Sequence, residues 1–261
     1  MSAQKKPAAL VTGGTSGIGL AVVRDLAARG HRVFLCARTE EQVEKTVAEL
    51  RGEGFDVDGA AADVRDRASV AALVRAAVDA FGPIGVLVNN AGRSGGGPTS
   101  DISDELWYDV IDTNLNSVFL MTREVLKNGG LEGAPYGRII NIASTAGKQG
   151  VVLGAPYSAS KHGVVGFTKA LGNELAPTGV TVNAVCPGYV ETPMAERVRA
   201  GYAAAYDSSE EEVMRKFTAK IPLGRYSTPE EVAALVGYLT TELASSITSQ
   251  ALNVCGGLGN F

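Results

Sequence analysis

The stretch AALVTGGTSGIGLAVVRDLAARG at residues 8–30 decides the fold of this chain. Its apolar start, Ala8–Thr12, predicts a buried strand, and a helical pattern follows until Gly30 ends it. The glycines of TGGTSGIG at 12–19 let the backbone turn tightly between the two and leave the helix N-terminus open to an anion. We therefore expect a strand–turn–helix unit that holds the pyrophosphate of a dinucleotide. The alternative is a plain glycine-rich turn.

Strand and helix patterns alternate along the rest of the chain. Further strands are predicted at Arg32–Ala37, Val57–Ala62, Gly85–Val88, 137–144, 180–187 and Ala251–Cys255. Helices are predicted at Glu40–Arg51, Arg67–Phe81, 103–113 continuing to Lys127, Tyr157 to about Ala176, and Pro229–Leu243. This alternation predicts a three-layer α/β Rossmann fold with a doubly wound, parallel, seven-stranded sheet, in one domain over residues 1–261.

The segment from Gly188 to about Arg225 interrupts the alternation, because it is polar, helical in places and rich in tyrosine and methionine. An insertion beyond the carboxyl end of a strand lies over the ligand crevice of a doubly wound fold. We expect a helical lid over residues 188–225. The alternative is an ordinary pair of surface helices.

The composition excludes several classes of protein. Hydrophobic residues make up 45% of the 261 positions and charged residues 20%, as in a soluble globular protein, and the net charge of −4 favours neither a nucleic acid nor a membrane as partner. No apolar run approaches the roughly 20 residues of a membrane span, and residues 1–10 lack the apolar core of a signal peptide. The three cysteines are expected to be buried reduced thiols of a cytoplasmic protein, and the two histidines are too isolated to form a metal site.

Candidate catalytic residues lie between Asn141 and Lys161. Ser144 ends an apolar strand, and Tyr157 and Lys161 lie four residues apart on one helix face. A nearby ammonium lowers the pKa of a phenol, and such a tyrosine can give a proton to a carbonyl oxygen that a serine hydroxyl also holds. The three residues predict carbonyl reduction if a hydride donor binds beside them. The alternative is a solvated helix face.

The end of the second predicted strand indicates which dinucleotide binds. An NAD site places a carboxylate there, but this strand ends in Cys-Ala followed by Arg38, and a cation suits the 2′-phosphate of NADPH. Glu40 and Glu41 lie in the first turn of the next helix, where acids favour the helix dipole. Asp63 follows the third strand and is placed to meet the adenine amino group. Its alternative role is a helix N-cap.

With these residues in place, the chain resembles a classical short-chain dehydrogenase/reductase along nearly its whole length. The shared motifs, in family order and spacing, are TGxxxGxG at 12–19, Asp63, NNAG at 89–92, Asn114, Ser144, Tyr157 with Lys161, and Pro187-Gly188 with Thr192 beyond. The resemblance implies that Tyr157 donates the proton and that Ser144 orients the carbonyl. It implies that Lys161 binds the nicotinamide ribose and lowers the pKa of the tyrosine. Asn114 would bend its helix and fix a water that resupplies protons.

The resemblance also predicts the residues that contact each ligand. The expected NADPH contacts are Thr12, Gly13, Thr15, Ser16, Gly17, Ile18, Gly19, Arg38, Asp63, Val64, Asn90, Ala91, Gly92, Tyr157, Lys161, Pro187, Gly188, Val190 and Thr192. The expected substrate contacts are Ser94, Gly95, Gly96, Thr145, Gln149, Val151, Met194, Tyr202 and Tyr206. No metal is implied.

A narrower likeness covers residues 144–194 and the stretch 251–261, which are similar to the ketoreductases of bacterial aromatic (type II) polyketide pathways. It implies that a homotetramer uses NADPH to reduce one ketone, usually at carbon 9, of a poly-β-ketone held by an acyl carrier protein. Two positions depart from that group. Ser94 stands where a motif linked to stereochemical control has proline, and Tyr206 stands where the lid has tryptophan.

An acidic carrier protein requires a basic docking surface. Arg38, Arg65 and Arg93 all follow predicted strands, so the fold should gather them on one rim of the crevice. We expect these arginines to dock the carrier. The alternative is that Arg65 and Arg93 are only solvated.

Two other functions remain open. A 3-oxoacyl-[acyl-carrier-protein] reductase of fatty-acid synthesis has the same mechanism and a shorter linear substrate, but the stretch Lys148–Val152 and the lid favour a polyketide enzyme. A catalytically silent NADPH-binding regulator usually lacks the tyrosine or the lysine, and both are present here.

Overall fold

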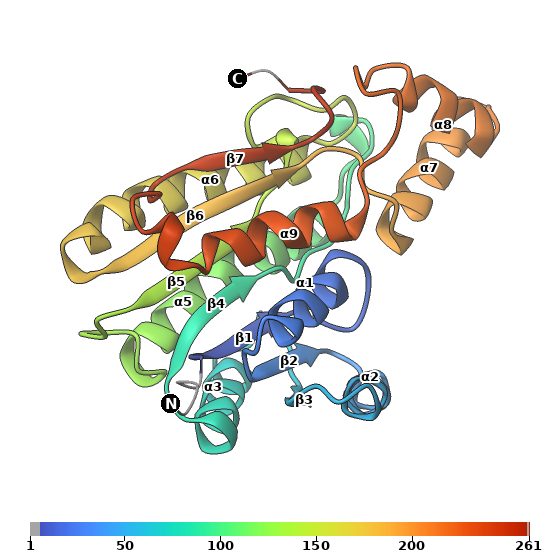
Figure 1. The fold of residues 1–261 in the computed structure, drawn as a ribbon. Helices are drawn as coiled ribbons and strands as arrows, with labels where there is room; N and C mark the ends of the chain where they lie inside the picture. The colour runs from blue at the N-terminus through green and yellow to red at the C-terminus, as the bar shows by residue number, and fades with distance from the viewer. Residues whose placement is uncertain (1–5, 260) are drawn as a thin grey trace.

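The computed structural model describes residues 6–259 and 261, and it folds around one parallel sheet (Figure 1). The strand order is β3-β2-β1-β4-β5-β6-β7, with every neighbouring pair parallel. The strands are β1 (Ala8–Thr12), β2 (Val33–Ala37), β3 (Val57–Ala61), β4 (Ile84–Asn89), β5 (Gly137–Ile142), β6 (Val180–Pro187) and β7 (Ala251–Val254). The predicted doubly wound seven-stranded sheet is confirmed.

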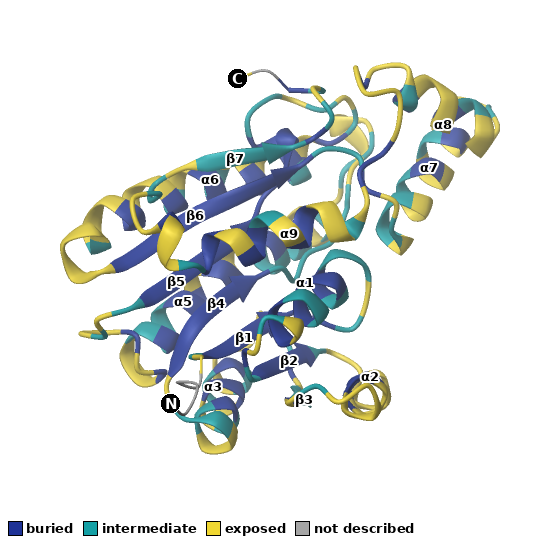
Figure 2. Cartoon of the chain, viewed as in Figure 1, coloured by how far each residue is buried: buried dark blue, intermediate teal, exposed yellow. Residues whose placement is uncertain are grey.

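Helices cover both faces of the sheet. One face carries α1 (Gly17–Ala28), α2 (Glu40–Gly52) and α9 (Pro229–Leu239). The other carries α3 (Arg67–Phe81), α5 (Ser117–Asn128) and α6 (Ala155–Leu175), while α4 (Asp104–Ile111) leads into α5. The central strands are buried on both faces, as Figure 2 shows, because the valines, isoleucines and leucines of each strand pack alternately against the two helix layers.

The expected ligand crevice follows from the strand order. The chain builds outward from β1 through β2 to β3, then returns and continues from β4 on the other side of β1. In such a sheet, ligands bind beyond the carboxyl ends of the strands where the order reverses. The glycine-rich turn follows β1 at this point and the NNAG motif ends β4, so both lie at the edge where a dinucleotide would bind.

The lid segment forms the helices α7 (Pro193–Ala205) and α8 (Glu210–Thr218), which project beyond the sheet (Figure 1). They enclose a small apolar cluster of their own. Its centre is Tyr189, whose ring stacks on Phe217 at 4.7 Å and on Tyr226 at 5.3 Å between centroids. The predicted helical segment is confirmed, and its aromatic residues pack mainly against each other.

The largest differences from the predicted helices lie at the last helix and around Asn114. The last helix ends at Leu239 instead of Leu243, because the hydroxyls of Thr240 and Thr241 bond back to carbonyls of the preceding turn. The chain between α4 and α5 is a π-helical turn at Asp112–Asn116.

The part of the chain left undescribed is short. Residues 1–5 belong to the N-terminal stretch predicted to lack the apolar core of a signal peptide, and Asn260 belongs to the closing stretch; both lie outside the described residues. Within residues 6–259, no helix combines the length and apolarity needed to cross a membrane.

Candidate active site

The tyrosine and lysine predicted to be catalytic lie in the first turns of α6. The Lys161 Nζ lies 5.8 Å from the centre of the Tyr157 ring and donates a 2.8 Å hydrogen bond to the carbonyl of Ile142. Ser144 comes two residues after that carbonyl, and its side chain lies near enough to the Tyr157 phenol to lower the pKa of the phenol. The end of β5 and the start of α6 therefore bring the three polar groups together.

The direction of the Tyr157 pKa differs from the prediction. Loss of solvent around the phenol raises its pKa, and the neighbouring Ser144 side chain opposes this only in part. Burial also lowers the pKa of Lys161 to about 8. The expected net lowering of the Tyr157 pKa is therefore wrong for this structure. Removing an ionised phenol from water costs more free energy than the neighbouring polar groups supply by stabilising the phenolate. Tyr157 stays protonated at neutral pH, which is the form that can donate a proton.

The buried cation at Lys161 leads to a prediction on stability. Because its pKa is about 8 when folded and 10.5 when unfolded, the unfolded chain binds more protons between these values, and stability rises with pH across this window. We expect Lys161→Met to raise the free energy of unfolding by about 3 kcal/mol near pH 7, and this gain to shrink by about 2 kcal/mol near pH 9.5. Urea unfolding of the wild-type and variant proteins at both pH values, with no ligand added, measures these differences in the free energy of unfolding.

The matched control for that experiment is Lys169→Met, because Lys169 is an exposed lysine on the same helix. Its substitution should leave stability nearly unchanged at both pH values. A Lys161→Met protein that is less stable than wild type near pH 7 contradicts the prediction.

Asn114 lies in the π-helical turn and is fully buried. Its Oδ1 accepts a 2.8 Å hydrogen bond from the Arg93 main-chain N–H, and its Nδ2 donates to the Arg93 carbonyl at 3.0 Å and to Ser160 Oγ at 3.1 Å. The side chain thus ties the loop after β4 to α6, where Tyr157 lies. The bend predicted at Asn114 is present, while the bound water stays a prediction.

The glycine-rich turn fits a pyrophosphate. Gly13 and Gly17 have φ values of +65° and +52°, a left-handed conformation that only glycine adopts easily. Ser16 precedes α1 without making a side-chain cap within the described residues. The first N–H groups of α1 therefore remain available to an anion.

Two predicted cofactor contacts, Thr12 at the end of β1 and Asn90 after β4, bond to each other's segments. Thr12 Oγ1 accepts hydrogen bonds from the main-chain N–H groups of Asn90 at 3.0 Å and Ala91 at 2.9 Å. In return, Asn90 Nδ2 donates to the carbonyls of Thr12 at 2.9 Å and Gly13 at 3.1 Å. The Thr12 hydroxyl and the Asn90 amide nitrogen therefore hold β1 against β4 and shape the crevice, and contact of these two residues with the cofactor stays a prediction.

Arg38 has the position expected of a phosphate-binding residue. It is exposed at the carboxyl end of β2 and makes no ion pair or hydrogen bond within residues 6–259 and 261. Glu40 and Glu41 lie in the first turn of α2, as predicted. The guanidinium is therefore free to bind a ligand.

Asp63 is paired within the protein. Its carboxylate accepts hydrogen bonds from the Arg65 guanidinium at 2.6 to 3.1 Å, and these bonds lower the pKa of Asp63. The alternative role as a helix N-cap is wrong, because Asp66 caps α3 through a 2.6 Å bond from the Ser69 N–H. Contact of Asp63 with adenine stays a prediction.

The expected basic rim is neutralised by acids. Asp109 of α4 accepts a 2.6 Å hydrogen bond from Arg65 through one oxygen and pairs with Arg93 through the other. Together with Asp63, these residues form a network of two cations and two anions. Arg65 and Arg93 are therefore ion-paired instead of freely basic, because of Asp63 and of Asp109, which no sequence motif singled out, and docking of a carrier at these arginines stays a prediction.

The loops that carry the predicted substrate contacts pack against each other. The Gly97 N–H donates to the Leu153 carbonyl at 2.8 Å, and a side chain at Gly96 would overlap that same carbonyl. Leu153 itself has φ +58°, a strained conformation for leucine that the sequence did not reveal. Gly96 is therefore required for this packing, beside any contact with substrate.

The lid is fastened over this region by Tyr202, whose hydroxyl donates to the Val152 carbonyl. Tyr206 stacks on the Tyr202 ring with a centroid separation of 5.9 Å but is 53% exposed, so it lies at the outer side of the lid. The remaining predicted substrate contacts are half-buried at Ser94, Gly95, Gln149, Val151 and Met194 and buried at Thr145. Of the two lid tyrosines, Tyr202 therefore contacts the loop that precedes α6, at Val152.

The remaining predicted cofactor contacts lie at the same edge. Thr15 and Ile18 lie in the glycine-rich turn and the start of α1, and Val64 follows β3. The others lie at or beyond the end of β6, at Pro187, Gly188, Val190 and Thr192, and Gly92 lies just after β4. All of them surround the proposed crevice.

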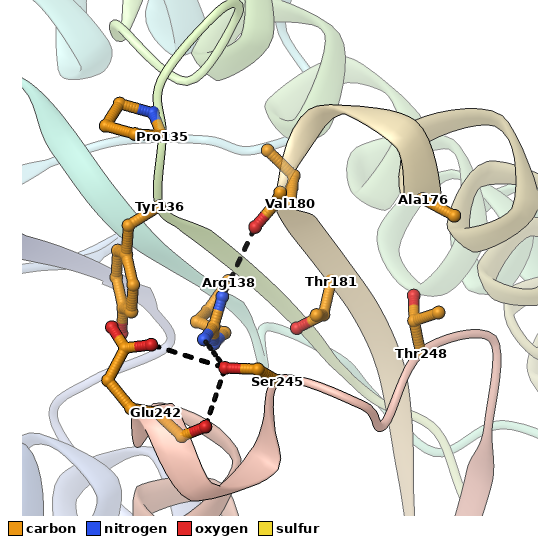
Figure 3. Close-up of a pocket in the computed structure, with 10 residues that line it drawn as sticks. Pro135, Tyr136, Arg138, Ala176, Val180, Thr181, Glu242, Ser245 and Thr248 are labelled. Atoms are coloured by element: carbon orange, nitrogen blue, oxygen red, sulfur yellow. Dashed lines mark hydrogen bonds between the residues drawn. The ribbon is translucent and has the colours of Figure 1, made fainter.

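A cavity of about 230 Å³ lies at the opposite, amino-terminal edge of β5 and β6 (Figure 3). Arg138 lies in it, with its guanidinium bonded to the Gly137 carbonyl at 2.9 Å and to Ser245 Oγ at 3.2 Å. The Glu242 carboxylate accepts from the same serine at 3.3 Å. The cavity is remote from Tyr157, and its charges are already paired through Ser245.

Comparison with known proteins gives a consistent result. The family model described as short chain dehydrogenase matches residues 7–203. The monensin polyketide synthase putative ketoacyl reductase of Streptomyces virginiae is 75% identical over 253 residues, 97% of each chain. The granaticin polyketide synthase putative ketoacyl reductase 1 of Streptomyces violaceoruber is 66% identical over 256 residues, 98% of this chain and 94% of that one. A crystal structure of a variant of the actinorhodin polyketide ketoreductase with NADPH matches with a TM-score of 0.96 and 59% identity over 100% of both chains.

Proposed function

The chain belongs to the short-chain dehydrogenase family, and we propose that it is an NADPH-dependent ketoreductase acting on an aromatic polyketide precursor. The substrate is a poly-β-ketone on an acyl carrier protein, and the reduced ketone is at carbon 9. The observation that carries the proposal is the group of buried Ser144, buried Lys161 and half-buried Tyr157 beside an open helix N-terminus. The 75% and 66% identities to two reductases of polyketide synthases support the substrate class.

The residues around the crevice suit NADPH. The N-terminus of α1 would hold the pyrophosphate, and the free guanidinium of Arg38 would bind the 2′-phosphate by charge-assisted hydrogen bonds. When bound, NADPH supplies the hydride that the reduction needs. A carbonyl beside Tyr157 then receives its proton from the chain itself.

In the proton transfer, Tyr157 donates from its phenol to the oxygen as negative charge develops there. Ser144 donates a hydrogen bond to the same oxygen and holds it in place. Lys161 is fixed by the Ile142 carbonyl within reach of the tyrosine ring, and its ammonium stabilises the phenolate left behind. Asn114 holds the loop after β4 against α6 throughout.

The experiment that tests the function is a turnover assay with purified protein. Trans-1-decalone, a bicyclic ketone, is compared with a short acetoacetyl thioester, each with NADPH and with NADH. The proposal predicts NADPH-dependent reduction of decalone. Preference for the acetoacetyl thioester with little decalone turnover would instead indicate a fatty-acid 3-oxoacyl reductase. NADPH binding without turnover of either ketone would indicate a regulator.

Docking of the carrier protein at the rim of Arg38, Arg65 and Arg93 is the finer part of the proposal. Because Asp109 pairs with two of these arginines, its removal should expose positive charge. We expect Asp109→Asn to lower the KM for carrier-bound substrate about threefold and to steepen its salt dependence, because an acidic partner meets a more basic surface. Steady-state kinetics at several salt concentrations measure both effects.

The matched control is Asp104→Asn, which changes the net charge equally on the same helix, α4, where Asp104 is exposed. It should leave the carrier KM near the wild-type value, and neither variant should alter the KM for free decalone. A carrier KM that is unchanged or raised by Asp109→Asn would remove Arg65 and Arg93 from the docking surface.

We also propose a homotetramer in the cytoplasm. Large apolar side chains are exposed on α4 and α5 at Trp107 and Phe119, and after α9 at Leu243, and such side chains often lie in subunit contacts. The three cysteines are free and buried, which suits a reducing compartment. Light scattering of the purified protein tests the tetramer.

A further inference from the structure

Lys148 ends the turn that begins at Ser144, here called the catalytic turn (residues 144–149), and uses all three donors of its ammonium on one distant part of the chain. It donates to the Ala251 carbonyl at 2.8 Å, to Asn253 Oδ1 at 3.0 Å and to the Phe261 main-chain oxygen at 2.9 Å. The ammonium also lies 5.5 Å from the centre of the Phe261 ring. An ammonium has three N–H groups, so none is left for a ligand. Its role must therefore be to hold these segments together.

The residues after β7, here called the tail (255–259 and Phe261), are folded back by this contact. Asn253 joins both sides of it, because its Oδ1 accepts from Lys148 and its Nδ2 donates to the Gly259 carbonyl at 3.1 Å. Within the tail, the Leu258 N–H donates to the Cys255 carbonyl at 3.1 Å. Bonds within the tail shape its turn, and the bonds that join the tail and Asn253 to the turn after Ser144 converge on Lys148.

The tail also supports the base of the lid. The Leu223 N–H, five residues beyond α8, donates to the Gly256 carbonyl at 3.0 Å. Gly256 and Gly257 lie so close to Ile221 and Pro222 that a side chain at either glycine would press on them. The lid therefore rests on the tail, and the tail is held by Lys148.

On its other side, Lys148 belongs to the turn that begins at Ser144. The main-chain N–H groups of Lys148 and Gln149 donate to the Thr145 carbonyl at 3.0 and 3.1 Å. Ser144 keeps its place independently, since its hydroxyl accepts from the Ala146 N–H at 3.1 Å. Losing the Lys148 ammonium would therefore release the tail and the lid base while leaving Ser144 in position.

We propose that Lys148 is a positioning residue that sets the spacing between the lid and the catalytic turn, and so the affinity for bulky ketones. The proposal rests on the proposed ketoreductase function and concerns the same site. A bicyclic ketone must touch both the turn at Gln149 and the lid, whereas a short ketone needs only the group around Tyr157. A looser lid base therefore weakens binding of the bulky substrate selectively.

The test compares Lys148→Met and Asn253→Leu with wild type. Asn253→Leu removes one of the groups that bond to the Lys148 ammonium and keeps the lysine itself. It provides the same test if Lys148→Met does not fold. We expect both variants to raise the KM for trans-1-decalone about fivefold, while kcat for decalone and both constants for a short acetoacetyl thioester stay within about twofold. Lys169→Met, an exposed lysine on α6, is the control and should change nothing.

Hydrogen exchange measures the coupling directly. In Lys148→Met, the Leu223 amide of the lid base and the Leu258 amide of the tail should both exchange about tenfold faster than in wild type. Equal losses on the two ketones, a decalone KM within about twofold of wild type, or unchanged exchange at Leu223 would each overturn the proposal. If the wild-type protein does not reduce decalone, the proposed function fails. Hydrogen exchange at Leu223 then decides by itself whether Lys148 holds the lid base in place.

Discussion

Replacing Tyr157 by phenylalanine should lower kcat for ketone reduction by about 10²-fold or more. The phenol lies beside Ser144 and Lys161, and its raised pKa keeps it protonated at neutral pH. Phenylalanine keeps the ring and its packing but cannot give a proton to the forming alkoxide. Steady-state kinetics on trans-1-decalone with NADPH measure the loss.

NADPH binding is the control for this variant, because the expected contacts with the phosphates lie at the glycine-rich turn and Arg38. The dissociation constant from fluorescence titration should stay within about threefold of wild type. If the Tyr157→Phe protein keeps more than about a tenth of wild-type kcat, another group donates the proton.

Reversing the charge at Arg38 should weaken NADPH binding by about 2–4 kcal/mol, while NADH binding changes much less. The substitution Arg38→Asp removes the free guanidinium at the end of β2 and places a carboxylate where the 2′-phosphate would lie. NADH lacks that phosphate, so it loses no such contact. Titration of each cofactor into the purified variant gives the two free energies.

Arg75→Asp makes the same charge change at an exposed position on α3 and is the matched control. It should leave both cofactors near their wild-type affinities, which separates the local contact from the change in net charge. An equal loss of NADPH and NADH affinity in Arg38→Asp would mean that Arg38 serves the fold.

Local patterns in the sequence predicted the fold well because they depend on neighbouring residues. Apolar runs, helical spacing and the glycines of 12–19 give the order of strands and helices, and parallel α/β topology follows from that order. The helix Arg67–Phe81 has the predicted boundaries, and the family resemblance drawn from the motifs is confirmed. The least accurate boundaries were at the last helix, which hydroxyl bonds to its own carbonyls end early, and near Asn114, where a π-helical turn lies between two helices.

The sequence by itself therefore determined the sheet, the position of the crevice and the identity of the polar groups that surround it. Only the tertiary structure decided how those groups are charged and paired. Burial sets the direction of the Tyr157 and Lys161 pKa shifts, and burial is a property of the packed molecule. Asp109 neutralises Arg65 across 44 positions, and Lys148 reaches Phe261 across 113. No spacing rule relates residues so far apart, because their contact exists only when the whole sheet has brought its loops to one edge.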